Sequence, residues 1–220
     1  MLKITRTSDR EHQYLKVLVY GQAGVGKTTL CSTVDNALII SAEGGLLSLR
    51  SHDIPVIEVS SIQEVQEAYK MIASSEECKD FEWICIDSLS EIGEVVLSTE
   101  KKLNKDPRKA YGALIDRMTD LIKAFRDLPR NVYMSAKAFD IPERQKCIPS
   151  MPGSKLGQEL PYFFDEVFAY RVADTEDGVK RALQTFNCGS WEAKDRSGIL
   201  DHYEDPHLGN IHTKIMSSNN

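Results

Sequence analysis

Hydrophobic residues in this chain fall into short runs that alternate with amphipathic stretches. Runs of strand length occupy residues 15–20, 37–42, 56–59, 81–88 and 132–136. Between them, apolar positions recur at helical spacing in residues 62–72, 89–104 and 111–125, and Ser61 is a candidate cap for the first of these helices. This alternation predicts an α/β fold with a mostly parallel central sheet that is covered by helices on both faces.

The last third of the chain departs from this alternation. Residues 137–161 contain several prolines and glycines, so we expect a long loop that is either functional or disordered. Two further strand-like runs, at 166–172 and 180–188, flank the turn-forming residues 174–178. These two runs predict a C-terminal antiparallel hairpin.

A glycine-rich segment after the first strand carries the most specific chemistry. Residues 21–28 read G-Q-A-G-V-G-K-T and match the phosphate-binding pattern G-x-x-x-x-G-K-[ST] at every fixed position. In such loops the backbone N–H groups wrap a phosphate, the lysine (here Lys27) reaches the β- and γ-phosphates, and the hydroxyl of the last residue (here Thr28) binds Mg²⁺. The alternative is a glycine-rich turn with an exposed lysine, but a strand before the loop and a helix from residue 29 to 34 argue against it. The predicted ATP-binding residues are Gly21, Gln22, Ala23, Gly24, Val25, Gly26, Lys27, Thr28 and Thr29.

Two acidic residues at the ends of other strands complete a candidate catalytic centre. Asp87 follows an apolar run and is expected to hold the Mg²⁺ hydration shell together with Thr28, or else it is an ordinary strand-terminal aspartate that starts a helix. Glu43 follows the second strand and is expected to take a proton from the attacking water, or else it is a solvated loop acid. Because parallel strands end at the same edge of a sheet, we expect these residues and Ser135 to converge on the glycine-rich loop.

Composition narrows the class of protein without identifying it. At 220 residues and 41% hydrophobic content, the chain suits one domain, which we expect over residues 14–215, with a flexible arm at 1–13 and a frayed tail at 216–220. No apolar run approaches the length of a membrane span, and the five cysteines form no C-x-x-C or zinc-binding pattern. We therefore expect a cytoplasmic protein with reduced thiols.

Charge is unevenly distributed along the chain. Although the net charge is −6, residues 43–100 contain 3 basic and 13 acidic residues, whereas residues 101–130 contain 9 basic and 4 acidic residues. A positive zone on an acidic protein can guide a polyanion to one face. On charge alone, a solvated helix surface is the simpler interpretation.

The ends of the second and fourth strands resemble the RecA-type ATPase core. The matching segments are I-I-S-A-E at 39–43 and I-C-I-D-S at 84–88, and the family keeps its catalytic glutamate after the strand that follows the phosphate loop. A third segment, A-K-D-R-S-G at 193–198, resembles the K-x-R finger of RecA-like ring helicases of the DnaB type, whose two cations reach the γ-phosphate of a neighbouring subunit. A polar turn is the alternative for this segment. The resemblance implies a Mg²⁺-dependent ATPase with the catalytic residues Lys27, Glu43 and, in trans, Lys194 and Arg196.

From about residue 14 to 215, the chain resembles the small phage recombinases of the single-strand annealing class, which are built on a bare RecA core. Its compact size, the segment M-P-G-S-K-L-G-Q-E-L-P at 151–161 and the finger-like segment carry this likeness. One position departs from the pattern. RecA relatives place an amide side chain after the strand that ends at Ser135, where it senses the γ-phosphate, whereas this sequence has Ala136 and Lys137.

The resemblance also implies a partner. In RecA-type proteins the loop after that strand contacts single-stranded DNA, which predicts phosphate contacts from Lys137, Arg144, Lys146 and Lys155 and base stacking on Phe139; the alternative is a proline-stiffened surface loop. The implied protein anneals or pairs DNA strands, assembles as a ring or filament with ATP between subunits, and works with a single-stranded DNA-binding protein in a bacterial host. Two other classes stay open: a nucleotide switch or phosphotransferase that does not act on DNA, and an assembly module with little turnover.

Overall fold

The computed structural model describes residues 14–175 and 178–217, and the structural statements below refer to these residues. The expected N-terminal arm and residues 218–220 of the expected tail lie outside them. Met216 and Ser217, the first two residues of that tail, belong instead to the last helix. No helix in the described ranges is long and apolar enough to cross a membrane.

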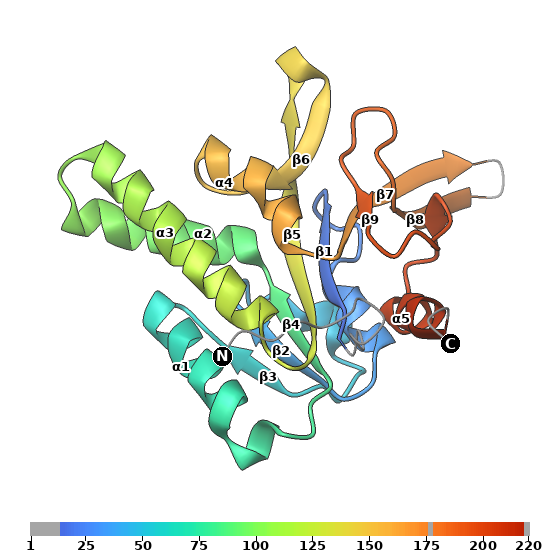
Figure 1. The fold of residues 1–220 in the computed structure, drawn as a ribbon, viewed down its shortest axis with the longest axis horizontal. Helices are drawn as coiled ribbons and strands as arrows, with labels where there is room; N and C mark the ends of the chain where they lie inside the picture. Colours follow the sequence, from blue (N-terminus) through green and yellow to red (C-terminus); the bar gives the residue numbers. More distant parts are fainter. Residues whose placement is uncertain (1–13, 176–177, 218–220) are drawn as a thin grey trace, which may run out of the picture.

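A ten-stranded sheet runs through the molecule, and its central part is parallel (Figure 1). The strands are β1 (Lys16–Gly21), β2 (Ala37–Ser41), β3 (Val56–Glu58), β4 (Trp83–Asp87), β5 (Asn131–Ile141), β6 (Lys146–Ser150), β7 (Glu166–Thr175), β8 (Gly178–Gln184), β9 (Lys194–Asp195) and β10 (Tyr203–Glu204). The order β3-β2-β4-β5-β1-β7 is parallel throughout. The antiparallel strands β8 and β10 extend the sheet beyond β7, which confirms the predicted C-terminal hairpin.

Alternate residues of the central strands are buried on opposite faces of the sheet, because successive side chains of a strand point to opposite sides. The helices are α1 (Ile62–Ser74), α2 (Leu89–Leu103), α3 (Pro107–Arg126), α4 (Ser154–Glu159) and α5 (Leu208–Ser217), with 3-10 helices η2 (Thr28–Thr33), η3 (Leu46–Leu49), η4 (Glu76–Cys78), η5 (Pro142–Arg144) and η6 (Leu160–Phe163). Leu18 and Ile40 face the layer of α1, α2 and α3. Val19 and Ile39 face the other layer, which η2, η3 and α5 cover. Both faces are therefore covered, one of them mostly by short elements.

The helix after the glycine-rich loop is shorter than the sequence indicates. It is a six-residue 3-10 helix, and Val34 is already extended. The hydroxyls of Ser32 and Thr33 donate to carbonyls three residues earlier, a local bonding pattern that competes with regular helix. Asn36, with a φ of 50°, then turns the chain into β2. A helix of this length therefore contributes little positive charge from its dipole to a phosphate site at its N-terminus.

The prediction of a long loop at 137–161 is wrong. β5 continues to Ile141, turns through η5 and returns as β6, which pairs antiparallel with β5. Gln145 closes the turn with a φ of 49°, and Pro149 is tolerated because β6 pairs with only one named strand. The hairpin is followed by α4 and η6, so the segment is ordered although its prolines indicated a loop.

Candidate functional site

The glycine-rich loop leaves the end of β1 and forms a cradle of backbone N–H groups. Gly24 and Gly26 have φ values of 75° and 111°, which side chains rarely allow, and a Cβ on Gly26 would lie 3.1 Å from the hydroxyl of Tyr170. Within the described residues, the N–H groups from Gly24 to Lys27 donate to no other group. Consecutive free N–H groups of this kind fit an anion such as a phosphate.

The side chain of Lys27 lies over the same loop. Its Nζ donates to the carbonyl oxygens of Gly21 and Gln22, at 2.9 Å each, and is partly buried. Burial lowers the pKa of Lys27, while the carboxylates of Asp87 and Glu43 act in the opposite direction. A partly desolvated ammonium whose partners in the described part of the chain are two carbonyls is suited to bind a phosphate oxygen.

Asp87 lies at the end of β4, nearly fully buried, and both of its carboxylate oxygens have a hydroxyl partner. Thr28 Oγ1 donates to Oδ2 at 2.6 Å, and the hydroxyl of Ser135 on β5 donates to Oδ1. Thr28 and Asp87 thus bring a hydroxyl and a carboxylate together, the oxygen groups that Mg²⁺ prefers, and these residues would hold the ion, Thr28 through its hydroxyl and Asp87 through the hydration shell. When bound, such an ion neutralises charge on the phosphates.

Glu43 follows β2 and is solvent-exposed at the same edge of the sheet. Its Oε1 accepts a hydrogen bond from Ser88 Oγ at 2.5 Å, and its charge acts on Lys27. Ser88 caps α2, so its hydroxyl fixes the Glu43 carboxylate beside the strand that carries Asp87. An exposed, oriented carboxylate is suited to accept a proton from water.

Lys137, predicted to contact DNA, lies beside the glycine-rich loop. Its Cα is paired with that of Gly21 in the β1–β5 register, and its Nζ forms an ion pair with Glu91 at 2.8 Å. The structure therefore places this cation at the base of the hairpin, at the end of the sheet where Lys27 also lies.

The other predicted DNA-binding residues lie further out. Phe139 is 55% exposed, and Arg144 is exposed in the hairpin turn. The remaining two cations are ion-paired, Lys146 with Glu192 at 2.5 Å and Lys155 with Glu159 at 3.7 Å.

The finger-like segment does not reach the glycine-rich loop of its own chain. β9 pairs with the start of β7, at the opposite edge of the parallel strands. Lys194 Nζ donates to the carbonyls of Phe164 at 2.5 Å and Pro161 at 3.2 Å, and Arg196 forms an ion pair with Asp165 at 2.6 Å. A role in trans requires both cations to leave these contacts.

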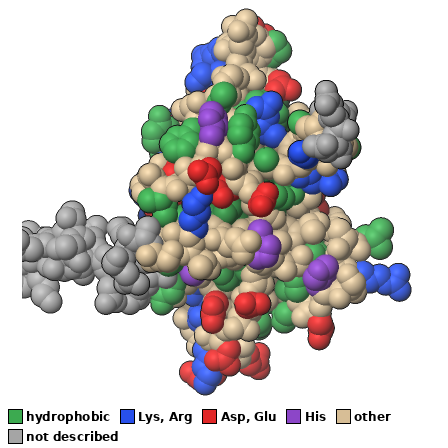
Figure 2. Space-filling model, turned by 90° about the vertical axis from the view of Figure 1, so that its right-hand side faces the viewer, with side chains coloured by type: hydrophobic (Ala, Val, Ile, Leu, Met, Phe, Trp, Pro, Cys, Tyr) green, Lys and Arg blue, Asp and Glu red, His purple; other side chains and the backbone are tan. Residues whose placement is uncertain are grey.

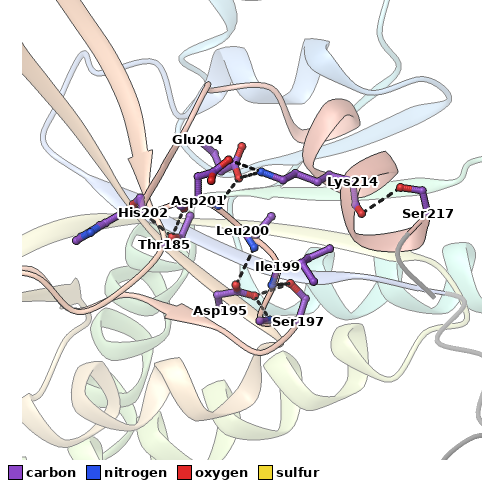
Figure 3. Close-up of polar contacts among 11 residues, drawn as sticks. Thr185, Asp195, Ser197, Ile199, Leu200, Asp201, His202, Glu204, Lys214 and Ser217 are labelled. Carbon is purple, nitrogen blue, oxygen red and sulfur yellow. Dashed lines mark hydrogen bonds and ion pairs between the residues drawn. The ribbon is translucent and has the colours of Figure 1, made fainter. Parts of the chain in front are cut away.

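The turn after Lys194 is built around the side chain of Asp195, as Figure 3 shows. Its carboxylate accepts hydrogen bonds from Ser197 Oγ at 2.5 Å, Gly198 N at 2.9 Å and Leu200 N at 3.1 Å. These hydrogen bonds help to hold the pKa of Asp195 below its usual value, against the effect of burial. The turn is therefore ordered by its own side chain.

Three residues of this site were not singled out from the sequence: Ser88, Glu91 and Tyr133. The spacing S-x-x-E at 88–91 is a capping signature and could have located Ser88 as a helix cap, although not its contact with Glu43. Tyr133 donates its hydroxyl to the carbonyl of Lys27 at 2.8 Å. That contact spans 106 positions of the chain, and no local signal indicates it.

A phosphate-binding loop, a buried aspartate two strands away and a mostly parallel sheet define a P-loop ATPase core. The sequence agrees: residues 13–197 match the family described as AAA domain, and since this is most of the chain, the protein belongs to that family. The predicted α/β P-loop core with antiparallel C-terminal strands is confirmed.

We also compared the chain with solved structures and with curated proteins. A KaiC-like protein from the hyperthermophilic archaeon Pyrococcus horikoshii is similar in structure, with a TM-score of 0.46 and 13% sequence identity over 77% of this chain and 76% of that chain. A likeness at this level adds no argument about function. A search of curated proteins gives no significant match.

Proposed function

We propose that this ATPase binds single-stranded DNA and promotes annealing or strand pairing, with ATP bound between subunits of a ring or filament. One observation supports the DNA part most directly: a group of exposed cations at the turn between α2 and α3, which we call the basic turn. Its members are Lys101, Lys102, Lys105, Arg108 and Lys109. Among the described residues, none of them forms an ion pair. The one acid in the turn, Asp106, caps α3.

The basic turn is better suited to a polyanion than the hairpin. A phosphate backbone gains affinity by replacing the counterions around cations that have no carboxylate partner, whereas Lys137, Lys146 and Lys155 must first give up a carboxylate. On the side of the molecule where β8 and α5 lie, Figure 2 shows both acidic and basic side chains. The concentration of one sign at the α2–α3 turn therefore distinguishes it from that side.

The basic turn is also connected to the ATP site. α2 begins directly after its cap Ser88, whose hydroxyl holds Glu43, and ends at the basic turn; a helix of this length spans about 22 Å. Figure 1 shows the α2–α3 pair projecting away from the sheet, with the turn at its free end. An arrangement of this kind gives a DNA strand access without covering the nucleotide.

Two further parts of the proposal rest on the resemblance to phage annealing proteins. These are the assembly into a ring or filament, in which Lys194 and Arg196 act on the neighbouring subunit's nucleotide, and a partnership with a bacterial single-stranded DNA-binding protein.

The test combines DNA binding with ATP turnover. A labelled single-stranded oligonucleotide is titrated at several salt concentrations against the unsubstituted protein and a variant with Lys101→Glu, Lys102→Glu and Lys105→Glu. We expect the variant to bind DNA more weakly, whatever the DNA sequence. The slope of log K against log salt concentration should become less negative by about two, because each of the three lost phosphate contacts contributes about −0.7 to that slope for single strands. The matched control reverses Lys70 and Lys79, two exposed lysines outside the turn.

The outcomes separate the alternatives. DNA-stimulated ATPase activity that the basic-turn variant loses supports the proposal. Indifference of the ATPase to DNA favours a nucleotide switch or phosphotransferase, and DNA binding without turnover favours an assembly module. If binding weakens only in a Lys146→Glu and Lys155→Glu variant, the DNA lies over the hairpin instead.

A further inference from the structure

The ion pair between Lys137 and Glu91 lies at the edge of the phosphate site. Lys137 Nζ is 2.8 Å from Glu91 Oε2, and the side chains are 50% and 35% exposed. The charges of Glu43 and Glu94 also stabilise the Lys137 ammonium, whereas the Lys27 ammonium and the Lys137 ammonium repel each other. Two cations and four carboxylates, Asp87 included, therefore share one region beside the glycine-rich loop.

The backbone of Lys137 is held by hydrogen bonds and strand pairing, whereas its ammonium is held by an exposed ion pair with Glu91. Its N–H donates to Ser90 Oγ at 2.9 Å, and the Ser90 hydroxyl donates to the carbonyl of Ser150 at 2.7 Å. The residue is also paired with Gly21 on one side and Ser150 on the other. These contacts hold the backbone of Lys137. Its half-exposed side chain can therefore change partner without a movement of the sheet.

The energetics favour such a change of partner. An exposed ion pair contributes little to stability, whereas a cation gains more from a phosphate oxygen in a partly desolvated site. We propose that Lys137 exchanges Glu91 for the terminal phosphate of a bound nucleoside triphosphate, and that this exchange makes the site prefer triphosphates to diphosphates. Glu91 is then the competitor that holds the cation when no terminal phosphate is present.

This inference rests on the nucleotide-binding part of the proposed function and not on DNA binding. Removing the cation and removing its competitor should act in opposite directions, which a purely structural ion pair would not do. Lys137→Met is expected to weaken triphosphate binding by about tenfold, the scale of one charge-assisted hydrogen bond, and to change diphosphate binding by less than about twofold. Glu91→Gln is expected to strengthen triphosphate binding by roughly twofold to fivefold, the scale of an exposed ion pair.

The experiment is an equilibrium titration of the full chain with a fluorescent non-hydrolysable ATP analogue and with fluorescent ADP, both with Mg²⁺. Lys137→Arg keeps the charge and should keep the selectivity. Lys79→Gln is the matched control, because Lys79 also forms an exposed ion pair, with Glu76 at 2.9 Å, away from the loop. Circular dichroism of each variant checks the fold.

Equal losses for the two nucleotides in Lys137→Met, or weaker triphosphate binding in Glu91→Gln, would overturn the inference. If Lys137→Met binds both nucleotides normally and keeps the preference for the triphosphate, the inference fails while the nucleotide-binding part of the proposed function stands. If the unsubstituted protein binds neither nucleotide, both the inference and the nucleotide-binding part of the proposed function fail.

Discussion

Replacing Glu166 by glutamine should make the protein more stable, and increasingly so as the pH rises. Glu166 lies on β7, is 1% exposed and is paired with Asp195 in the β7–β9 register. Burial, with the Asp195 charge as the next cause, raises the pKa of Glu166 from its usual 4.5 to about 8. Since the folded state holds this proton more tightly than the unfolded state, the contribution to stability is complete below about pH 4.5 and is lost as the pH rises through about 8.

The magnitude follows from the size of the pKa change. A pKa that rises from 4.5 to about 8 on folding corresponds to about 5 kcal/mol, of which about 3 kcal/mol falls between about pH 5 and about pH 8. Glutamine has nearly the same shape and cannot ionise, so the difference in the free energy of unfolding between Glu166→Gln and the unsubstituted protein should grow by that amount.

Urea unfolding followed by circular dichroism at both pH values measures this difference. A change of about 3 kcal/mol moves the urea midpoint by on the order of 1 M. Glu58→Gln, at an exposed position of β3, is the control and should show a constant difference. If the Glu166→Gln difference is also independent of pH, the carboxyl of Glu166 is already ionised in the folded protein and the reasoning is refuted.

Three further predictions concern the ATP site. Glu43→Gln should retain nucleotide and Mg²⁺ binding and slow hydrolysis by roughly a hundredfold or more in a phosphate-release assay; unchanged turnover would make Glu43 an ordinary loop acid. Ser135→Ala removes one of the two hydroxyls that donate to the Asp87 carboxylate. Thermal unfolding should show that the free energy of unfolding falls by about 1–2 kcal/mol, and nucleotide binding should need a higher Mg²⁺ concentration. An unchanged Mg²⁺ requirement would contradict the positioning role of Ser135. A mixture of Lys27→Ala and Arg196→Ala subunits should recover part of the ATPase activity that each lacks alone, because a trans arginine can contribute about a thousandfold. No recovery in a confirmed mixed assembly would exclude the trans assignment.

Local patterns predicted the parts of this protein that local physics determines. The glycine-rich loop is identified by residue types at fixed spacing, and its Gly24 and Gly26 adopt the φ values that only glycine adopts readily. The cap of α1 was also predicted from the sequence. The Ser61 side chain accepts a hydrogen bond from the Glu64 N–H, and the Glu64 side chain accepts one from the Ser61 N–H, which together form a capping box. The last helix was missed although Leu208, Ile211 and Ile215 recur on one face and are buried.

Long-range register explains what the sequence did not predict. The Lys137–Glu91 ion pair depends on β5 lying next to β4 and the start of α2, which carries Glu91, and no window of sequence contains that pairing. The hairpin of β5 and β6 was missed because its prolines are typical of loops, yet one of them begins the turn and another occupies a strand that tolerates it. Lys194 and Arg196 were expected at a nucleotide, and their contacts with Phe164 and Asp165 follow from the β7–β9 pairing.

The central claim is that the loop at residues 21–28 binds ATP with Mg²⁺, and one titration tests it most directly. Fluorescent ATP with Mg²⁺ is added to the unsubstituted protein and to Lys27→Ala, whose fold should be intact because Lys27 Nζ, among the described residues, donates only to the carbonyls of Gly21 and Gln22 in its own loop. We predict tight binding by the unsubstituted protein and a loss of on the order of a hundredfold in the variant, since a charged hydrogen-bond partner of the phosphates is removed. Equal affinity of the two proteins would contradict the claim.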